Sequence, residues 1–133
     1  QAINYTNKTQ FLFRIQKGIL DINDTGVNDY IKPENQRVPF RNMIYIGDSD
    51  TDIPCMSLVN ANGGHSIGVY DPFKKDKEKV YKMMRHHRIR YYAPADYTNG
   101  SKLDTLVKQI IRKTAAYEVL EGEYIHCKYE AEE

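Results

Sequence analysis

The segment Met43-Ile44-Tyr45-Ile46-Gly47-Asp48-Ser49-Asp50-Thr51-Asp52 decides the fold class of this chain. Its first four residues form a short, continuous apolar run, which ends at Gly47-Asp48. An apolar run of this length between turn-forming residues is typical of a strand buried on both faces, as in a parallel sheet. We therefore predict a strand over residues 43–46 with Asp48 at its carboxyl end.

The residues after this segment alternate between helical and extended patterns. We predict a helix over residues 53–60, a strand over 65–70, a basic helix over 76–88 and a short strand over 89–93. Ser101 and Asp104 resemble a capping box, which predicts the start of a last helix. Strands that alternate with helices indicate an α/β fold, in which helices flank a parallel sheet.

Two further segments complete the expected organisation. Residues 6–17 predict a helix that ends at Gly18, because Phe11, Leu12 and Ile15 follow helical spacing. Residues 121–133 are polar and acidic, and we expect a loosely held tail there. The predicted division is therefore a domain over residues 1–120 and a tail over 121–133.

Composition excludes several classes of protein. With 41% hydrophobic and 28% charged residues and a net charge of +1, the chain has an ordinary globular composition without the charge excess of a nucleic-acid or membrane-surface binder. No apolar run approaches the roughly 18 residues of a membrane span, and the first residues do not resemble a signal peptide. Two cysteines are too few for a disulfide framework. We therefore expect a cytoplasmic protein with no membrane partner.

The acidic cluster after the first strand is the candidate site. Asp48, Asp50 and Asp52 place three carboxylates within five residues, at the end of the strand where open α/β sheets build their sites. These charges repel one another, and a hard divalent cation such as Mg²⁺ would relieve the repulsion. An acidic turn that caps the next helix would give the same spacing.

A lysine upstream is the second candidate. Lys8 lies near the start of the predicted helix over 6–17, where the helix dipole disfavours a cation. A phosphate or a carboxylate nearby would explain this position, and so would simple exposure to solvent.

Together these segments resemble the haloacid dehalogenase superfamily of phosphohydrolases. Residues 47–52 match the fourth motif of that family, a strand that ends in Gly-Asp with a second acid four residues after the first. Lys8 is the best match to the third motif, with Lys17 as a rival, and residues 62–69 look like the strand that follows the fourth motif. The resemblance implies part of a Rossmann-like sheet and a magnesium-dependent phosphatase acting on a small phosphorylated substrate.

The family's mechanism gives each matched residue an expected role. Asp48 would coordinate Mg²⁺, and Asp52 would complete the metal site, by holding a metal-bound water, or orient Lys8. Lys8 would neutralise the nucleophile and the transferring phosphoryl group, a role that suits phosphoryl transfer. The predicted catalytic residues are thus Lys8, Asp48 and Asp52, and the predicted metal ligands are Asp48 and Asp52.

A second register is possible, because the first motif of the family is also a strand followed by Asp-x-Asp. Asp48 would then be the nucleophile and Asp50 the general acid-base. Asp52 stands where that motif usually carries Thr or Val, and no later strand ends in Gly-Asp. We favour the fourth motif, so we expect the nucleophile upstream of Gln1 and an inactive isolated chain that needs the missing amino-terminal half or a second copy of itself.

Two other functions remain open at this stage. The chain could be a non-catalytic α/β module that acts through protein or RNA contacts, for which the sequence offers basic and aromatic residues over 82–92. A solvated helix face is the simpler interpretation of these residues, so we do not expect nucleic acid as a partner. A receiver-like signalling domain also gathers acids at strand ends, but the strand that ends at Asp71 runs into Pro72.

Overall fold

The computed structural model describes Leu12, Ile15, residues 38–74 and residues 76–132. The chain divides into two compact units, Gln1–Ala95 and Asp96–Glu133, which we describe separately. Of the predicted helix over residues 6–17, only Leu12 and Ile15 are described, and both are helical. Leu12 is buried, whereas Ile15 is 43% exposed.

The first unit is built on a parallel sheet of three strands. Strand β1 spans Ile44–Gly47, β2 spans His65–Tyr70 and β3 spans Tyr91–Pro94. The strand order is β1-β2-β3, and both pairs are parallel. The predicted α/β fold with a parallel, Rossmann-like sheet is therefore confirmed. Within the described residues β1 pairs only with β2, so β1 lies at an edge of this sheet.

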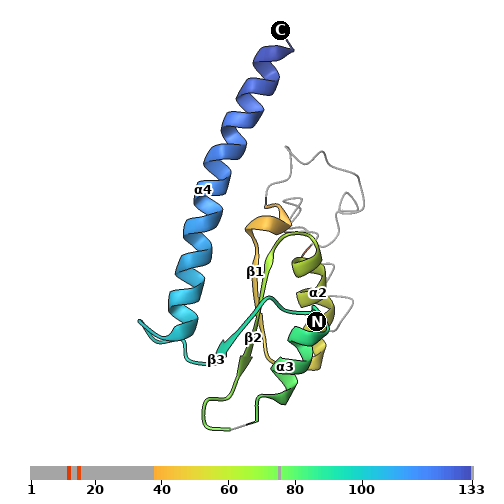
Figure 1. Cartoon of the computed structure of the whole chain (residues 1–133), viewed down its shortest axis with the longest axis vertical. Helices are drawn as coiled ribbons and strands as arrows, with labels where there is room; N and C mark the ends of the chain where they lie inside the picture. The colour runs from red at the N-terminus through yellow and green to blue at the C-terminus, as the bar shows by residue number, and fades with distance from the viewer. Residues whose placement is uncertain (1–11, 13–14, 16–37, 75, 133) are drawn as a thin grey trace. The chain divides into compact units, whose positions relative to one another are not determined.

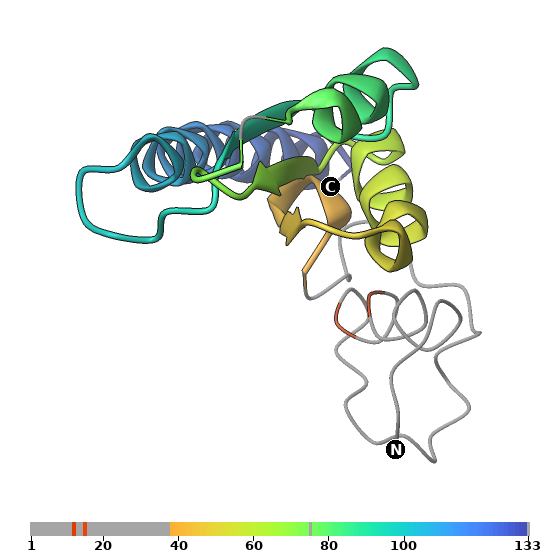
Figure 2. The ribbon, with the colours of Figure 1, turned by 90° about the horizontal axis from the view of Figure 1, so that it is seen from below.

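Helices α2 (Ile53–Ala61) and α3 (Glu78–Arg85) connect these strands. Because the strands are parallel and adjacent in chain order, each connection must cross back over the sheet. Both helices lie on the same side of the strands (Figure 1), and the view from below in Figure 2 shows the same arrangement. In α3, Glu78 in the first turn and Arg85 in the last complement the helix dipole.

A close-packed apolar layer holds α3 against the sheet. Met56, Val80, Met83 and Ile89 form one buried cluster. Gly68 in β2 faces this cluster, and a Cβ atom there would lie 2.9 Å from Ile89 Cδ1. A larger residue at position 68 would therefore crowd the side chains of Ile89, Met83 and Val80, which would have to repack.

The helix predicted over residues 76–88 ends at Arg85, three residues early. His87 has a φ of 59°, in the left-handed region. The amide groups of His87 and Arg88 turn back to the carbonyl groups of Met84 and Met83, which is a common way to end a helix. Strand β3 then begins at Tyr91 rather than at Ile89.

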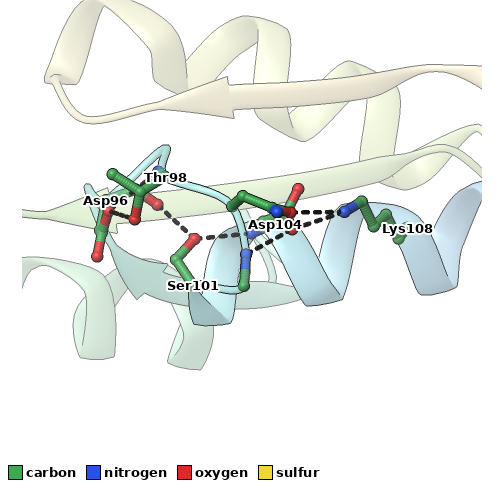
Figure 3. A network of polar contacts seen from close by, with 7 residues as sticks. Asp96, Thr98, Ser101, Asp104 and Lys108 are labelled. Carbon is green, nitrogen blue, oxygen red and sulfur yellow. Dashed lines mark hydrogen bonds and ion pairs between the residues drawn. The ribbon is translucent and has the colours of Figure 1, made fainter.

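The second unit contains the 30-residue helix α4, Lys102–Ala131. Ser101 caps its start, since Ser101 Oγ accepts a hydrogen bond from the Asp104 amide at 3.1 Å. Figure 3 shows how this cap joins a larger network: Ser101 Oγ donates to the Asp96 carbonyl, Thr98 donates to the Asp96 carboxylate, and Lys108 pairs with Asp104. The Asp96 and Asp104 carboxyl groups both have a lowered pKa, chiefly through the hydrogen bonds from Thr98 and Lys108, respectively.

The predicted tail is helical where the structure describes it. Residues 121–131 continue helix α4 without interruption, where a loosely held segment was expected. The predicted division into residues 1–120 and 121–133 stays a prediction. Among the described residues, no helix combines the length and apolar character that crossing a membrane requires.

Candidate functional site

Strand β1 delivers Asp48 to the carboxyl edge of the sheet, as predicted. The strand ends at Gly47 and the exposed Asp48 follows it directly. Asp71 follows β2 in the same way, and Ala95 follows β3. These three residues line a pocket of about 350 Å³ together with Val69, Tyr70, Pro72 and Phe73. The described part of the sheet therefore has its pocket where parallel sheets usually carry their sites.

Asp52 has a different environment from Asp48, because it is buried and organises the turn after β1. Its Oδ2 accepts hydrogen bonds from the Asp48 amide at 3.2 Å and from the Ser49 amide at 3.3 Å. The Ser49 hydroxyl also donates to Oδ2, at 3.1 Å. Ser49 and Asp52 form a capping box at the short 3-10 helix η4, Asp50–Asp52. Asp52 thus holds the backbone that presents Asp48.

Tyr45 supplies the remaining support of Asp52. Its hydroxyl donates to Asp52 Oδ1 at 2.8 Å. Burial raises the pKa of Tyr45 well above its ordinary value, and the hydrogen bond to Asp52 raises it further. Tyr45 is therefore a neutral donor at physiological pH. The sequence analysis missed this role, although strand alternation puts Tyr45 on the same face as Gly47, which lies beside Asp52.

Gly47 is required by this arrangement for a steric reason. A Cβ atom at position 47 would lie 2.7 Å from Asp52 Cβ and 2.9 Å from its Cγ. No side chain fits between β1 and the Asp52 carboxylate at these distances. The glycine before Asp48 thus allows Asp52 to fold back onto the strand end.

Asp50 points to yet another partner. Its carboxylate lies 3.4 Å from Lys79 Nζ in α3, and both side chains are largely exposed. The three carboxylates of the acidic cluster therefore have separate environments: Asp52 is hydrogen-bonded, Asp50 is paired with Lys79, and Asp48 lines the pocket. Among the described residues, no group of three or more His, Cys, Asp or Glu side chains is arranged to hold a metal.

This geometry still fits magnesium with few protein ligands. Mg²⁺ retains several waters in proteins and is commonly held by one or two carboxylates together with substrate phosphates. Asp48 offers such a carboxylate at an open pocket. Asp52 stays a predicted ligand or water-binding residue. Its Oδ1 accepts a hydrogen bond from the Tyr45 hydroxyl, and its Oδ2 accepts from the Asp48 and Ser49 amides and from the Ser49 hydroxyl. Lys8 and its rival Lys17 lie outside the described residues, so their roles stay predictions.

The pocket wall includes Asp71 and Pro72, which the sequence analysis used only to mark the end of a strand. Asp71 Oδ1 accepts a hydrogen bond from the Phe73 amide at 2.9 Å, which fixes the turn after β2. The Phe73 side chain is 94% exposed at the pocket. Tyr70 also lines the pocket, and Lys77 Nζ lies over its ring, 5.1 Å from the ring centre. The turn residues Asp71-Pro72 were the available signal, but only the neighbouring strands place them beside Asp48.

The basic residues behind the RNA-contact alternative are partly engaged within the first unit. Arg85 forms an ion pair with Glu78 at 2.7 Å. Arg88 Nη1 donates to Ser57 Oγ at 3.3 Å. Both arginines are exposed, so these contacts arrange them along the surface of α3 and α2 without burying their charge.

Comparison with known proteins adds one distant relative. An uncharacterized protein of Borreliella burgdorferi is 27% identical over 101 residues, which are 76% of this chain and 34% of that protein. The chain therefore spans about a third of the length of the relative that it matches. No protein-family model matches the chain, and no solved structure matches it either.

Proposed function

We propose that this chain carries the metal-binding part of a magnesium-dependent phosphate-ester hydrolase similar to the haloacid dehalogenase superfamily. One observation carries the proposal: Asp48 directly follows a strand of a parallel sheet and lines the pocket at its carboxyl edge. The hydrogen bonds of Asp52 order the turn that presents this carboxylate.

In this proposal the residues of the chain have distinct tasks. Asp48 is the carboxylate that holds Mg²⁺, and Asp52 keeps the turn in a single conformation, in addition to any water that it holds for the metal. Lys8 supplies positive charge near the reacting groups. When bound, Mg²⁺ would neutralise charge on the phosphoryl oxygens. Phosphoryl transfer depends mainly on such positioning and charge neutralisation.

The position of β1 in the sheet supports a nucleophile from another segment. Within the described residues β1 has a neighbour on one side only. In the proposed family the strand with the nucleophilic aspartate lies on the other side of β1. A strand added there would end beside Asp48, since the carboxyl ends of parallel strands meet at one edge.

A non-catalytic α/β module is the second candidate, and it has an observation in its favour. Asp50 and Asp52 have partners within the chain, Lys79 and Tyr45, respectively. The repulsion that would call for a cation is thereby reduced. Measurements of phosphate-ester hydrolysis and of metal binding by Asp48 distinguish the hydrolase from the non-catalytic module.

The hydrolysis test compares two polypeptides. The 133-residue chain should show no enzyme-like turnover of p-nitrophenyl phosphate, because covalent catalysis needs a nucleophile opposite the metal. A longer polypeptide, in which a strand ending in Asp-x-Asp precedes this chain, should hydrolyse the ester only with Mg²⁺. Asp48→Asn should lower its kcat/KM by at least about 100-fold, and the matched change Asp50→Asn should leave it nearly unchanged.

Two results would contradict the proposal. Turnover by the 133-residue chain that Asp48→Asn abolishes would make Asp48 the nucleophile and restore the first-motif register. A longer polypeptide that binds Mg²⁺ but hydrolyses no phosphate ester would favour the non-catalytic module.

A further inference from the structure

The distal half of helix α4 exposes large apolar side chains. Tyr117 is 45% exposed, Leu120 70% and Tyr124 61%. Cys127 and Ala131, farther along the same helix, are also exposed. Apolar side chains gathered on one stretch of surface are commonly covered by a partner.

These five residues follow the spacing of a coiled-coil seam. Their positions, 117, 120, 124, 127 and 131, are separated alternately by three and four residues. This is the heptad pattern in which two helices pack knobs into holes. We name the five residues the α4 seam: Tyr117, Leu120, Tyr124, Cys127 and Ala131.

We propose that the α4 seam binds the same seam of a second copy of this chain, as a parallel two-stranded coiled coil. Tyr117, Tyr124 and Ala131 would occupy the a positions, and Leu120 and Cys127 the d positions. This surface is distinct from the β1 edge and from the pocket beside Asp48.

Charge decides the direction of the second helix. Glu123 lies at a g position and Lys128 at the following e position. In a parallel pair, g of one helix faces the next e of the other, so Glu123 and Lys128 meet twice across the interface. An antiparallel pair would face g with g and e with e, so Glu123 would meet either Glu123 or Glu130 of the other helix, while Glu121 would meet Lys128. The like charges at the facing g positions disfavour the antiparallel arrangement.

The length of the seam bounds the strength of the association. Helix α4 is already formed over 30 residues, so pairing does not require new helix formation. The preceding d position is Lys113, and it ends the apolar seam on the amino-terminal side. Five core layers lie at the small end of specific interfaces, so we expect a dissociation constant on the order of micromolar.

Sedimentation equilibrium of the full chain over a wide concentration range tests the proposal with matched variants. Leu120→Glu and Tyr124→Glu place charges in the seam and should raise the dissociation constant at least about 10-fold. Val119→Glu and Tyr129→Glu are controls, because these side chains are 72% and 56% exposed but lie off the seam. They should change the constant by less than about twofold. Far-UV circular dichroism confirms that each variant keeps its helix.

Cys127 reports the direction of the helices. In the parallel dimer two Cys127 residues share one layer, and a disulfide needs Cα atoms within about 7 Å. Diamide, which takes up the two electrons and two protons released, should cross-link the chain through Cys127, and Cys127→Ser should prevent it. Cys55 is fully buried and should not contribute. Lys128→Glu should weaken the dimer, and adding Glu123→Lys should restore it.

Three outcomes would overturn the proposal. The chain could stay monomeric over the whole range. It could form a dimer that Leu120→Glu leaves intact, which would place the interface elsewhere, for example at β1. It could form a dimer that Leu120→Glu disrupts but diamide does not cross-link, which would exclude the parallel arrangement.

Discussion

The hydroxyl of Tyr45 donates a hydrogen bond to Asp52 Oδ1 at 2.8 Å and ties strand β1 to the turn that follows it. The other oxygen of Asp52 accepts from the backbone of Asp48 and Ser49. The carboxylate is thus held from the strand on one side and from the turn on the other. These hydrogen bonds stabilise the turn, so contacts within the chain position Asp48.

Tyr45→Phe should destabilise the first unit, because it removes a donor from a buried carboxylate. A hydrogen bond to a charged group contributes roughly 1.5–3 kcal/mol, and we expect a loss of that size in the free energy of unfolding. Urea denaturation measures it. Tyr97→Phe is the control: Tyr97 is 68% exposed, and its replacement should cost less than about 0.5 kcal/mol. Equal losses in the two variants would refute the role of the Tyr45 hydroxyl.

The raised pKa of Tyr45 also predicts a loss of stability in alkali. The ordinary tyrosine value is 10.0, and burial and the Asp52 hydrogen bond raise the pKa of Tyr45 above it in the folded chain. The contribution of the neutral phenol is therefore fully present below pH 10 and is lost as the pH rises towards the folded-state pKa. Urea denaturation across this range should show a steeper decline for the natural chain than for Tyr45→Phe. Parallel declines would contradict the assignment.

Gly47→Ala should destabilise the chain through overpacking. The new Cβ would lie 2.7 Å from Asp52 Cβ, and such a contact forces the turn to move. We expect a loss of about 1–3 kcal/mol, together with shifted amide resonances at Asp48 and Ser49. Gly122→Ala in helix α4 is the matched control. No atom lies within 4 Å of a Cβ at position 122, so this change should increase helix stability by about 0.5–1 kcal/mol. A neutral Gly47→Ala would show that Asp52 does not depend on close approach to β1.

Ser101→Ala should weaken the start of helix α4, because Ser101 Oγ accepts a hydrogen bond from the Asp104 amide. Loss of such a cap costs about 1 kcal/mol, and thermal denaturation followed by far-UV circular dichroism measures it. Ser57→Ala is the comparison. In the described structure the Ser57 hydroxyl accepts a hydrogen bond only from the exposed Arg88, so its loss should have a smaller effect. A smaller loss for Ser101→Ala than for Ser57→Ala would contradict the capping role.

The sequence predicts the sheet well because the strand signals are local. The apolar run before Gly47-Asp48 and the run over residues 65–70 each mark a strand within one residue of its observed bounds. The end of α3 was missed, because it depends on the left-handed conformation of His87, a residue that tolerates this conformation without requiring it. The helical residues after position 120 were missed because their largely polar and acidic composition outweighed the helical spacing of Leu120, Tyr124, Cys127 and Ala131.

The candidate site was predictable only in part, because some of its contacts exist only once the chain is folded. Asp48 follows a strand signal directly, so its place at the sheet edge could be predicted. The partner of Asp50 is Lys79, which lies 29 residues away in the sequence and reaches it only because α3 packs on the sheet. The support from Tyr45 likewise requires the strand and the turn to be folded together. The distant contact with Lys79 and the local contact with Tyr45 thus give Asp48, Asp50 and Asp52 different environments.

Magnesium titration of the ¹⁵N-labelled chain, followed by NMR, tests the central claim most directly. We predict saturable shifts of the amide resonances of Gly47, Asp48 and Ser49. Asp48→Asn should lower the apparent magnesium affinity at least about 10-fold, whereas Asp50→Asn, whose carboxylate pairs with Lys79, should change it by less than about threefold. No saturable shift at these residues, or an affinity that Asp48→Asn leaves unchanged, would contradict the assignment of Asp48 as the metal-binding carboxylate.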